Sequence, residues 1–419
     1  MKLTKENVFL IVCIMGFLAI LSSTMSKSPV LPYFADYLKT PQSWHEGLVF
    51  SASTIPGILI SLPAGSLSDI VGRRKVLVVS GFLFASAPFF YLFVNIWWEL
   101  ALVRFYHGFA TGMFVPVAQA MIAEAYPARR GERISLFSSV TTIGRSLAPL
   151  LGAYILIVTN PGLEVGQYTN FQGLYVAVGA AGTAAFITAL PFLRGNKPAA
   201  KLGASGKIAF DRVAQGWISL ARTRGVLVVS LVEAGQYYVY GSVESYLVKY
   251  MKDFTAIGGF PQGVVLFSLV IIVMLSKPFI GRFSDRAGRR TPIVLGCVVS
   301  SIPLVLMPLS TQFPILLVLA MIYGLGFSMV TSSTPAMVSE FVPIEKVGGA
   351  MGFISTLMDV GQTFGPIVCG FILGASLGYI SLFASLSLVL MVTVFMFALV
   401  KIGKPSSMVT AHGDYQKLR

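Results

Sequence analysis

The sequence predicts an all-α integral membrane protein with twelve transmembrane helices, arranged as two six-helix bundles that are parallel repeats of each other. Of its 419 residues, 55% are hydrophobic and only 11% are charged, whereas soluble domains carry about 25% charged residues. Apolar runs such as VLVVSGFLFASAPFFYLFV, from Val76, have the length of about 20 residues that a helix needs to cross a bilayer. GSLSDIVGRRK begins at Gly65 and GRFSDRAGRRT at Gly281, so a charged phrase recurs at a shift of 281 − 65 = 216 residues.

The apolar runs define the twelve spans. They cover residues 8–38, 46–70, 76–95, 98–126, 134–158, 171–193, 225–251, 260–284, 291–309, 313–341, 347–375 and 378–400. The first span has the basic start and apolar stretch of a signal peptide, but no small-residue cleavage site follows it. We therefore expect this span to be retained.

The repeat extends beyond the charged phrase. Glu124 and Pro127 correspond to Glu340 and Pro343 at the same shift of 216 residues. Because each repeat holds an even number of helices, both copies enter the membrane from the same side. The predicted units are an N-terminal bundle at 1–193, a cytoplasmic linker with an interfacial helix at 194–224, a C-terminal bundle at 225–400 and a cytoplasmic tail at 401–419.

The net charge of +14 has a topological explanation. Most of the 31 Lys and Arg residues lie in the termini and in the loops on the same side as the termini. The positive-inside rule then places both termini in the cytoplasm and makes the chain a multi-pass protein of the cell membrane. We expect no nucleic-acid partner. The three cysteines lie in predicted spans without a CxxC pattern, so neither a metal site nor a cofactor is expected.

The repeated phrase predicts a gate at the cytoplasmic ends of the helices. Gly72 and Gly288 allow sharp turns, and the arginines that follow them remain at headgroup level. Asp69 and Asp285 lie about one turn inside the membrane, where a carboxylate needs a partner. Topogenic charge alone explains the arginines but not the repeated Gly, Ser and Asp. The gate candidates are Gly65, Asp69, Gly72, Arg73, Arg74, Glu124, Gly281, Asp285, Gly288, Arg289, Arg290 and Glu340.

These motifs resemble those of the major facilitator superfamily. GSLSDIVGRRK is similar to the family's signature between helices 2 and 3, its second copy falls between helices 8 and 9, and RFYHGFATG, from Arg104, is similar to the helix 4 signature. GRSLAPLLGAY, from Gly144, and GQTFGPIVCG, from Gly361, resemble the Gly-Pro signature of the twelve-helix drug:proton antiporters. The first copy departs from that pattern at Ala148. The resemblance implies alternating access, in which two bundles rock around a central cavity.

Small residues and prolines in these two copies predict close packing and bends of helices 5 and 11. The residues concerned are Gly144, Pro149, Gly152, Gly365 and Pro366.

Ionisable residues within spans are costly and are therefore the candidates for function. EAGQYYVYGSVE places Glu233, Tyr237, Tyr240 and Glu244 on one helical face, which we expect to line the cavity. Aromatic faces beside a carboxylate suit a cationic or amphipathic guest. Alternatively, the tyrosines belong to the interfacial belt and Glu244 lies near the outer surface. The cavity candidates are Lys27, Arg145, Gln236, Tyr237, Tyr240, Glu244 and Gln362.

Two of the intramembrane acids are candidate proton carriers, Asp359 and Glu233. A low-dielectric cavity favours the protonated form of a carboxylate, as a carrier requires. Asp359 could instead be a structural partner of Arg145 or Lys277. Arg104, from the helix 4 signature, is a candidate to support coupling, or else it pairs with a backbone carbonyl or a nearby acid.

The sequence allows more than one role for each of three further residues. His107 could titrate, although a lone histidine also serves as a hydrogen-bonded packing residue. Lys27 and Arg145 could bind a carboxylate or phosphate on the guest. Alternatively, these two cations neutralise acids of the protein, with Asp359, Glu233 and Asp36 as the candidates.

The expected function is that of a monomeric secondary active transporter, with a small-molecule substrate, protons and the lipid bilayer as partners. We favour proton-coupled export of small amphipathic compounds. The alternatives are a dedicated transporter of a sugar, metabolite or anionic amphiphile, and a membrane sensor that no longer transports. The chain has no HExxH, GxSxG or P-loop motif, so an enzyme is not expected.

Overall fold

The computed structural model describes residues 4–60, 68, 72–126, 129–163, 167–194, 218–255, 257, 259–343 and 347–400. Within these residues the secondary structure is helical. The N-terminal half contains α1 (Lys5–Met25), α2 (Val30–Tyr37), α3 (Ser43–Ser51), α5 (Arg73–Phe90), η1 (Tyr91–Phe93), α6 (Trp97–Ala125), α7 (Arg130–Thr159), α8 (Gln172–Ala189) and η3 (Leu190–Arg194). The C-terminal half contains α10 (Arg224–Phe254), α11 (Phe260–Ala287), α12 (Arg290–Leu306), η4 (Met307–Leu309), α13 (Phe313–Glu340), α14 (Val347–Gly374) and α15 (Gly378–Leu399).

The all-α membrane fold predicted from the sequence is confirmed, and the described helices follow the predicted spans with two differences in detail. The first span is two helices, α1 and α2, because Pro29 lacks a backbone N–H and cannot continue α1. The second span is interrupted by turn residues after α3 and becomes helical again at residues 55–60. The expected interfacial helix of the linker lies mostly outside the described residues, and only 218–222 are seen to be helical.

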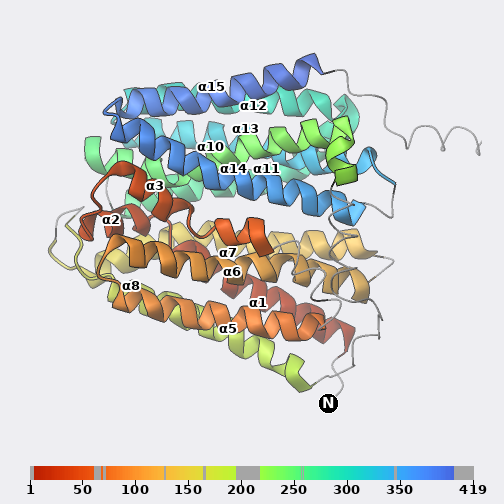
Figure 1. The fold of residues 1–419 in the computed structure, drawn as a ribbon, viewed down its shortest axis with the longest axis horizontal. Coiled ribbons are helices and arrows are strands. Elements are labelled where there is room, and N and C mark those ends of the chain that lie inside the picture. The colour runs from red at the N-terminus through yellow and green to blue at the C-terminus, as the bar shows by residue number, and fades with distance from the viewer. Residues whose placement is uncertain are drawn as a thin grey trace, which may run out of the picture.

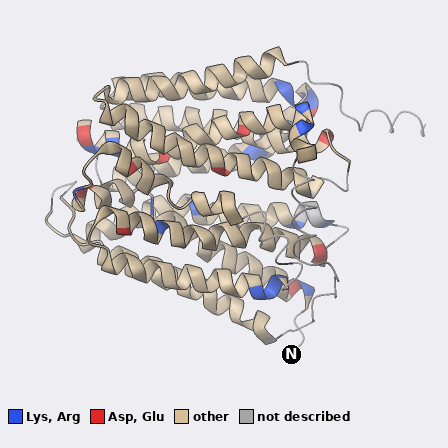
Figure 2. Cartoon of the chain, viewed as in Figure 1, with Lys and Arg blue, Asp and Glu red and all other residues tan. Residues whose placement is uncertain are grey.

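Ten of the described helical segments are long and apolar enough to cross a membrane. Figure 1 shows the long helices aligned along a common axis, with the C-terminal half above the N-terminal half. We call the end where α1 begins and α15 ends the proximal end and the opposite end, which carries α2 and the start of α3, the distal end. Figure 2 shows described Lys and Arg concentrated near the proximal end, as the charge pattern of the loops predicts.

The hydrophobic core is divided differently at the two ends. Toward the proximal end each half has a core of its own, one around Phe114 and Phe137 and the other around Val330 and Phe397. Toward the distal end a single core includes residues of both halves. Among the described residues, the two halves are therefore fused by packing at the distal end.

Candidate functional site

Backbone lies against backbone where the halves meet at the distal end. α3 packs on α14, and α7 packs on α11. A Cβ built on Gly47 of α3 would lie 2.5 Å from the carbonyl oxygen of Pro366, and one on Gly370 of α14 would lie 2.5 Å from that of Ser43. On the other side, a Cβ on Gly263 would lie 2.8 Å from the carbonyl oxygen of Pro149. Glycine permits these close approaches because it has no side chain.

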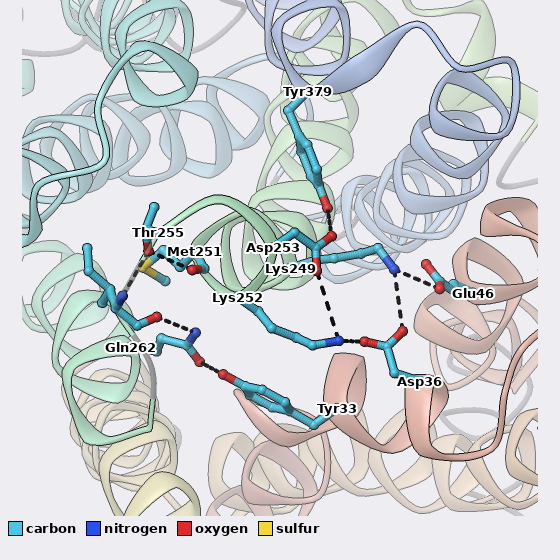
Figure 3. A network of polar contacts seen from close by, with 11 residues as sticks. Tyr33, Asp36, Glu46, Lys249, Met251, Lys252, Asp253, Thr255, Gln262 and Tyr379 are labelled. Carbon is cyan, nitrogen blue, oxygen red and sulfur yellow. Dashed lines mark hydrogen bonds and ion pairs between the residues drawn. The ribbon is translucent and has the colours of Figure 1, made fainter. Parts of the chain in front are cut away.

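A polar network lies over this contact, as Figure 3 shows. Lys249 of α10 contacts Glu46 of α3 at 2.7 Å and Asp36 of α2 at 3.5 Å. Lys252, one turn further along α10, also pairs with Asp36. Glu46 is buried, with 5% of its surface exposed, so its pairing is needed to offset the loss of water. We call this network, with its hydrogen-bonded neighbours, the distal latch; its members are Tyr33, Asp36, Glu46, Lys249, Lys252 and Gln262.

The distal latch follows the internal repeat. Tyr33 of the N-terminal half donates a hydrogen bond to Gln262 of the C-terminal half, and Lys249 of the C-terminal half donates one to Glu46 of the N-terminal half. Tyr33 and Lys249 are 249 − 33 = 216 positions apart, and Glu46 and Gln262 are 262 − 46 = 216 positions apart. The two contacts thus repeat each other, one neutral and one charged.

The cavity-facing residues predicted on helix 7 meet charged groups of other helices. The charges of Glu233, Asp359 and Arg145 all act on the hydroxyl of Tyr237. Arg145 of α7 hydrogen-bonds Tyr240 and is also close to Glu244. We call this group the central site; its members are Lys27, Arg145, Glu233, Tyr237, Tyr240, Glu244, Lys277 and Asp359.

Asp359, a predicted proton carrier, lies at the junction between the halves. A Cβ built on Gly57 of the second span would be 2.6 Å from Oδ2 of Asp359, so the carboxylate packs directly on that helix. The charge of Arg145 acts on Asp359, as one of the alternatives from the sequence anticipates.

Glu233, the other predicted carrier, is buried in the C-terminal half with 5% of its surface exposed. It accepts a hydrogen bond from the hydroxyl of Thr334 on α13. The charge of Lys277 on α11 acts on Glu233.

Lys27 does not neutralise any of the three acids named for it from the sequence. Its Nζ lies 2.8 Å from Oε2 of Glu244, because the break between α1 and α2 directs the Lys27 side chain toward α10.

Arg104 stabilises the interruption of the second span. Its guanidinium donates to the carbonyl oxygens of Val49 at 2.6 Å and Phe50 at 3.0 Å, and to Oγ of Ser53 at 2.9 Å. These carbonyls come from the last turn of α3, where a helix leaves acceptors unsatisfied. The structure therefore matches the alternative in which Arg104 pairs with backbone carbonyls.

Three other candidates lie apart from the central site or at its margin. His107 is buried in the N-terminal half, with Nδ1 3.4 Å from the hydroxyl of Tyr91. Gln236, predicted to face the cavity, is fully buried and donates to Sγ of Cys297 at 3.4 Å, because its side chain points into the C-terminal bundle. Gln362 packs over Gly241 of α10.

The predicted gate shows paired charges in both halves. Arg73 lies 3.1 Å from Glu124, and Arg289 lies 2.9 Å from Glu340. The shift of 216 positions relates the first pair to the second, Arg73 to Arg289 and Glu124 to Glu340. Arg289 also pairs with Asp285. Each pair joins the start of one helix to the end of the next within the same half.

The turns of the gate have the predicted geometry. Gly72 and Gly288 have φ angles of +103° and +81°, which favour glycine. Arg290 donates to the carbonyl oxygens of Phe397 and Ala398 at the end of α15. Gly281 has open space around it, Arg74 is engaged in an interaction, and Gly65 and Asp69 lie outside the described residues.

Helices 5 and 11 pack closely against their partners at the glycines of their signature. Cβ atoms on Gly144 and Gly152 of α7 would lie 2.7 Å and 3.2 Å from the carbonyl oxygens of Phe17 and Ser28. On α14, Gly365 faces the backbone of Tyr238 even more closely. The signature glycines thus fix α7 to α1 and α14 to α10.

We expect Gly365→Ala to destabilise the C-terminal half. The new methyl would overlap the carbonyl of Tyr238 and lie 2.7 Å from Oγ of Ser242, and overpacking of this kind costs about 1–3 kcal/mol. Gly352→Ala is the control, because it lies on the same helix with nothing within 4 Å of a Cβ. The measurement is the midpoint of thermal unfolding in detergent. Equal midpoints for the two variants would show that the contact is not tight.

A sequence model of the Major Facilitator Superfamily matches residues 12–276 and 246–414. The chain is 24% identical over 375 residues to an uncharacterized MFS-type transporter of Methanocaldococcus jannaschii, covering 88% of this chain and 91% of the relative. It is 25% identical over 395 residues to a PmrA homolog of Lactococcus lactis, described as a multi-drug resistance efflux pump, covering 90% of this chain and 89% of the relative. It is 26% identical over 348 residues to the quinolone resistance protein NorA of Staphylococcus aureus, covering 82% of this chain and 84% of the relative.

Solved structures share the fold. A bacterial homolog of the human lysosomal transporter Spinster, in an inward-facing conformation, matches with a TM-score of 0.74 at 13% identity and 95% coverage of both chains. The human organic anion transporter MFSD10 matches with a TM-score of 0.67 at 16% identity, covering 94% of this chain and 100% of that chain. The helical pattern, the doubled signature and these matches agree: the chain belongs to the Major Facilitator Superfamily and is a membrane transporter rather than an enzyme.

Proposed function

We propose that this protein exports small amphipathic compounds across the cell membrane in exchange for protons, as a monomer that works by alternating access. The observation that carries the proposal is the central site. In it, the charges of two intramembrane acids, Asp359 and Glu233, both act on one tyrosine, Tyr237, and Asp359 packs on the second span at the junction between the halves. Acids in such surroundings are candidates for proton transfer.

The contacts between the halves support alternating access. The distal latch and the shared core hold the halves together at one end, while separate cores lie at the other. With the termini in the cytoplasm, as the basic residues favour, the structure corresponds to a state closed toward the outside. Opening the distal end and joining the proximal ends would expose the central site to the other side.

The proton and the guest bind this site from opposite sides of the membrane. Asp359 or Glu233 takes a proton when the site faces outside, and the deprotonated acid attracts the guest when the site faces the cytoplasm. The gradient drives export because the two ligands compete for one cavity, and each can shift the equilibrium only by its difference in affinity for the two states.

The choice of export rather than import is supported by the relatives. The Lactococcus lactis relative is described as an efflux pump and the Staphylococcus aureus relative as a resistance protein. Tyr237 and Tyr240 form an aromatic wall with Phe327, at centroid distances of 5.2 Å and 4.8 Å. Such a wall suits a guest with an apolar, planar part.

The test is transport by the purified protein in sealed liposomes with an imposed pH gradient. Amphipathic aromatic compounds of positive, neutral and negative charge are supplied, and their movement is compared with and without the gradient. Gradient-driven movement of at least one compound, abolished by a protonophore, is the expected result. Movement that is the same in liposomes without protein would exclude the proposal.

A second candidate function is a dedicated transporter of an anionic metabolite. Arg145 of the central site favours it, because this cation is held between Tyr240 and Glu244 where it could meet a carboxylate. In the same assay this function predicts that small hydrophilic anions move and amphipathic compounds do not.

A further inference from the structure

The ion pair between Lys27 and Glu244 has a place in the fold that neither the proposed proton step nor the distal latch uses. Lys27 lies in the break between α1 and α2, and Glu244 lies on α10. Their side chains are 23% and 13% exposed. Opposite charges from the two halves are therefore in direct contact here.

A small cavity adjoins this pair. Its lining includes Thr24, Ser28, Arg145, Tyr240, Glu244 and Leu269. Its volume is about 10 Å³, which is close to the space of one water molecule. A guest that enters from the proximal side must therefore displace side chains, and the Lys27–Glu244 ion pair and the hydrogen bond of Arg145 with Tyr240 both join the two halves here.

Charge balance then decides which guest can displace the pair. A cation that binds Glu244 leaves Lys27 without its partner and close to the like charge of Arg145. An anion that binds Lys27 leaves Glu244 without its partner. Either exchange leaves a partly buried charge unpaired, which is strongly unfavourable.

Arg145 does not remove this restriction. It hydrogen-bonds Tyr240 and its charge acts on Asp359, so it already has an acid to balance. Lys277 is exposed, and its charge acts on Glu233. Among the half-buried groups of the central site, two cations, Lys27 and Arg145, are matched by two acids, Glu244 and Asp359, and a guest with no net charge preserves that balance.

We infer that the Lys27–Glu244 pair selects zwitterionic guests, whose carboxylate replaces Glu244 on Lys27 and whose ammonium group replaces Lys27 on Glu244. This inference rests on the proposed function, because it names the substrate class of the same site. The aromatic wall of Tyr237, Tyr240 and Phe327 takes the apolar part of the guest. The substrate class is therefore an aromatic amphiphile that carries one carboxylate and one ammonium group.

A matched series of three compounds tests the inference. Biphenylalanine carries both charges, 2-(biphenyl-4-yl)ethylamine carries only the ammonium group, and 3-(biphenyl-4-yl)propanoic acid carries only the carboxylate. We measure binding to the purified protein by calorimetry and transport in liposomes. For the unmodified protein we expect at least a tenfold preference for the zwitterion in both measurements.

Single substitutions should redirect the preference in opposite directions. Lys27→Gln leaves Glu244 free and should favour the amine, whereas Glu244→Gln leaves Lys27 free and should favour the acid. The exchanged variant Lys27→Glu/Glu244→Lys restores both charges and should again favour the zwitterion. Thermal unfolding of each variant separates loss of selectivity from loss of folding.

Three outcomes would overturn the inference: equal binding of the amine and the zwitterion to the unmodified protein, equal binding of the acid and the zwitterion, or a shift of both single variants in the same direction. Failure of the proposed function is distinguishable. Selective binding of the zwitterion with no gradient-driven movement supports the inference and contradicts proton-coupled export. Gradient-driven movement with the wrong order of compounds does the reverse.

Discussion

Lys249→Met should shift the transporter toward a state that is open at the distal end. The substitution keeps most of the side-chain volume but leaves Glu46 buried without its cation and removes one partner of Asp36. Removing one member of a buried pair costs about 3–5 kcal/mol, and opening the distal end hydrates the carboxylate. Since about 1.4 kcal/mol is a factor of ten, the equilibrium should move by roughly a hundredfold or more.

The measurement is the distance between spin labels on the two halves at the distal end. Leu163 and Thr311 are exposed in distal loops of the N- and C-terminal halves, so labels there should move apart in Lys249→Met. Lys39→Met is the matched control, because Lys39 is an exposed lysine at the same end. The exchange Glu46→Lys/Lys249→Glu should recover the short distance. An unchanged distance in Lys249→Met would mean that the apolar core alone holds the distal end closed.

Asp359→Asn and Glu233→Gln should separate proton coupling from guest binding. Each amide keeps the size of the acid and cannot take up and release a proton. We expect at least one of the two variants to lose gradient-driven efflux down to the leak of empty liposomes. Exchange of guest across the membrane without a gradient should persist in that variant because it requires no proton carrier, while binding of the guest should persist but weaken, because the attraction of the deprotonated acid is lost.

The control for these two variants is Glu6→Gln. Glu6 lies at the start of α1, 65% of its side chain is exposed, and its only described ion pair is with Arg133. Its substitution should leave efflux at the unmodified rate. If both Asp359→Asn and Glu233→Gln also transport at that rate, neither acid carries the proton.

The sequence predicted the features that depend on composition and on the repeat. The spans follow from apolar length, and the gate pairs Arg73–Glu124 and Arg289–Glu340 join residues that recur at a shift of 216 positions. Both properties are local or periodic, so they can be recognised without knowledge of how the helices pack.

The contacts between the halves could not be predicted in the same way. Lys249 and Lys252 stand at the end of an apolar run in the sequence, but nothing in that run tells that α10 turns them toward Asp36 and Glu46. Lys27 was assigned several possible acids, and its partner proved to be Glu244. The repeat relates the contact of Tyr33 with Gln262 to that of Lys249 with Glu46, but it does not tell which helices of the two bundles face each other.

The seam between α3 and α14 has a mechanical consequence. Gly47 and Gly370 bring stretches of main chain into direct contact across this seam. Interlocked side chains must leave their rotamers before two helices can part, and each such move adds to the barrier. Where main chain meets main chain, no side chain has to change rotamer before the two helices part. Bulky residues introduced at Gly47 and Gly370 would therefore slow the rocking of the halves in both directions.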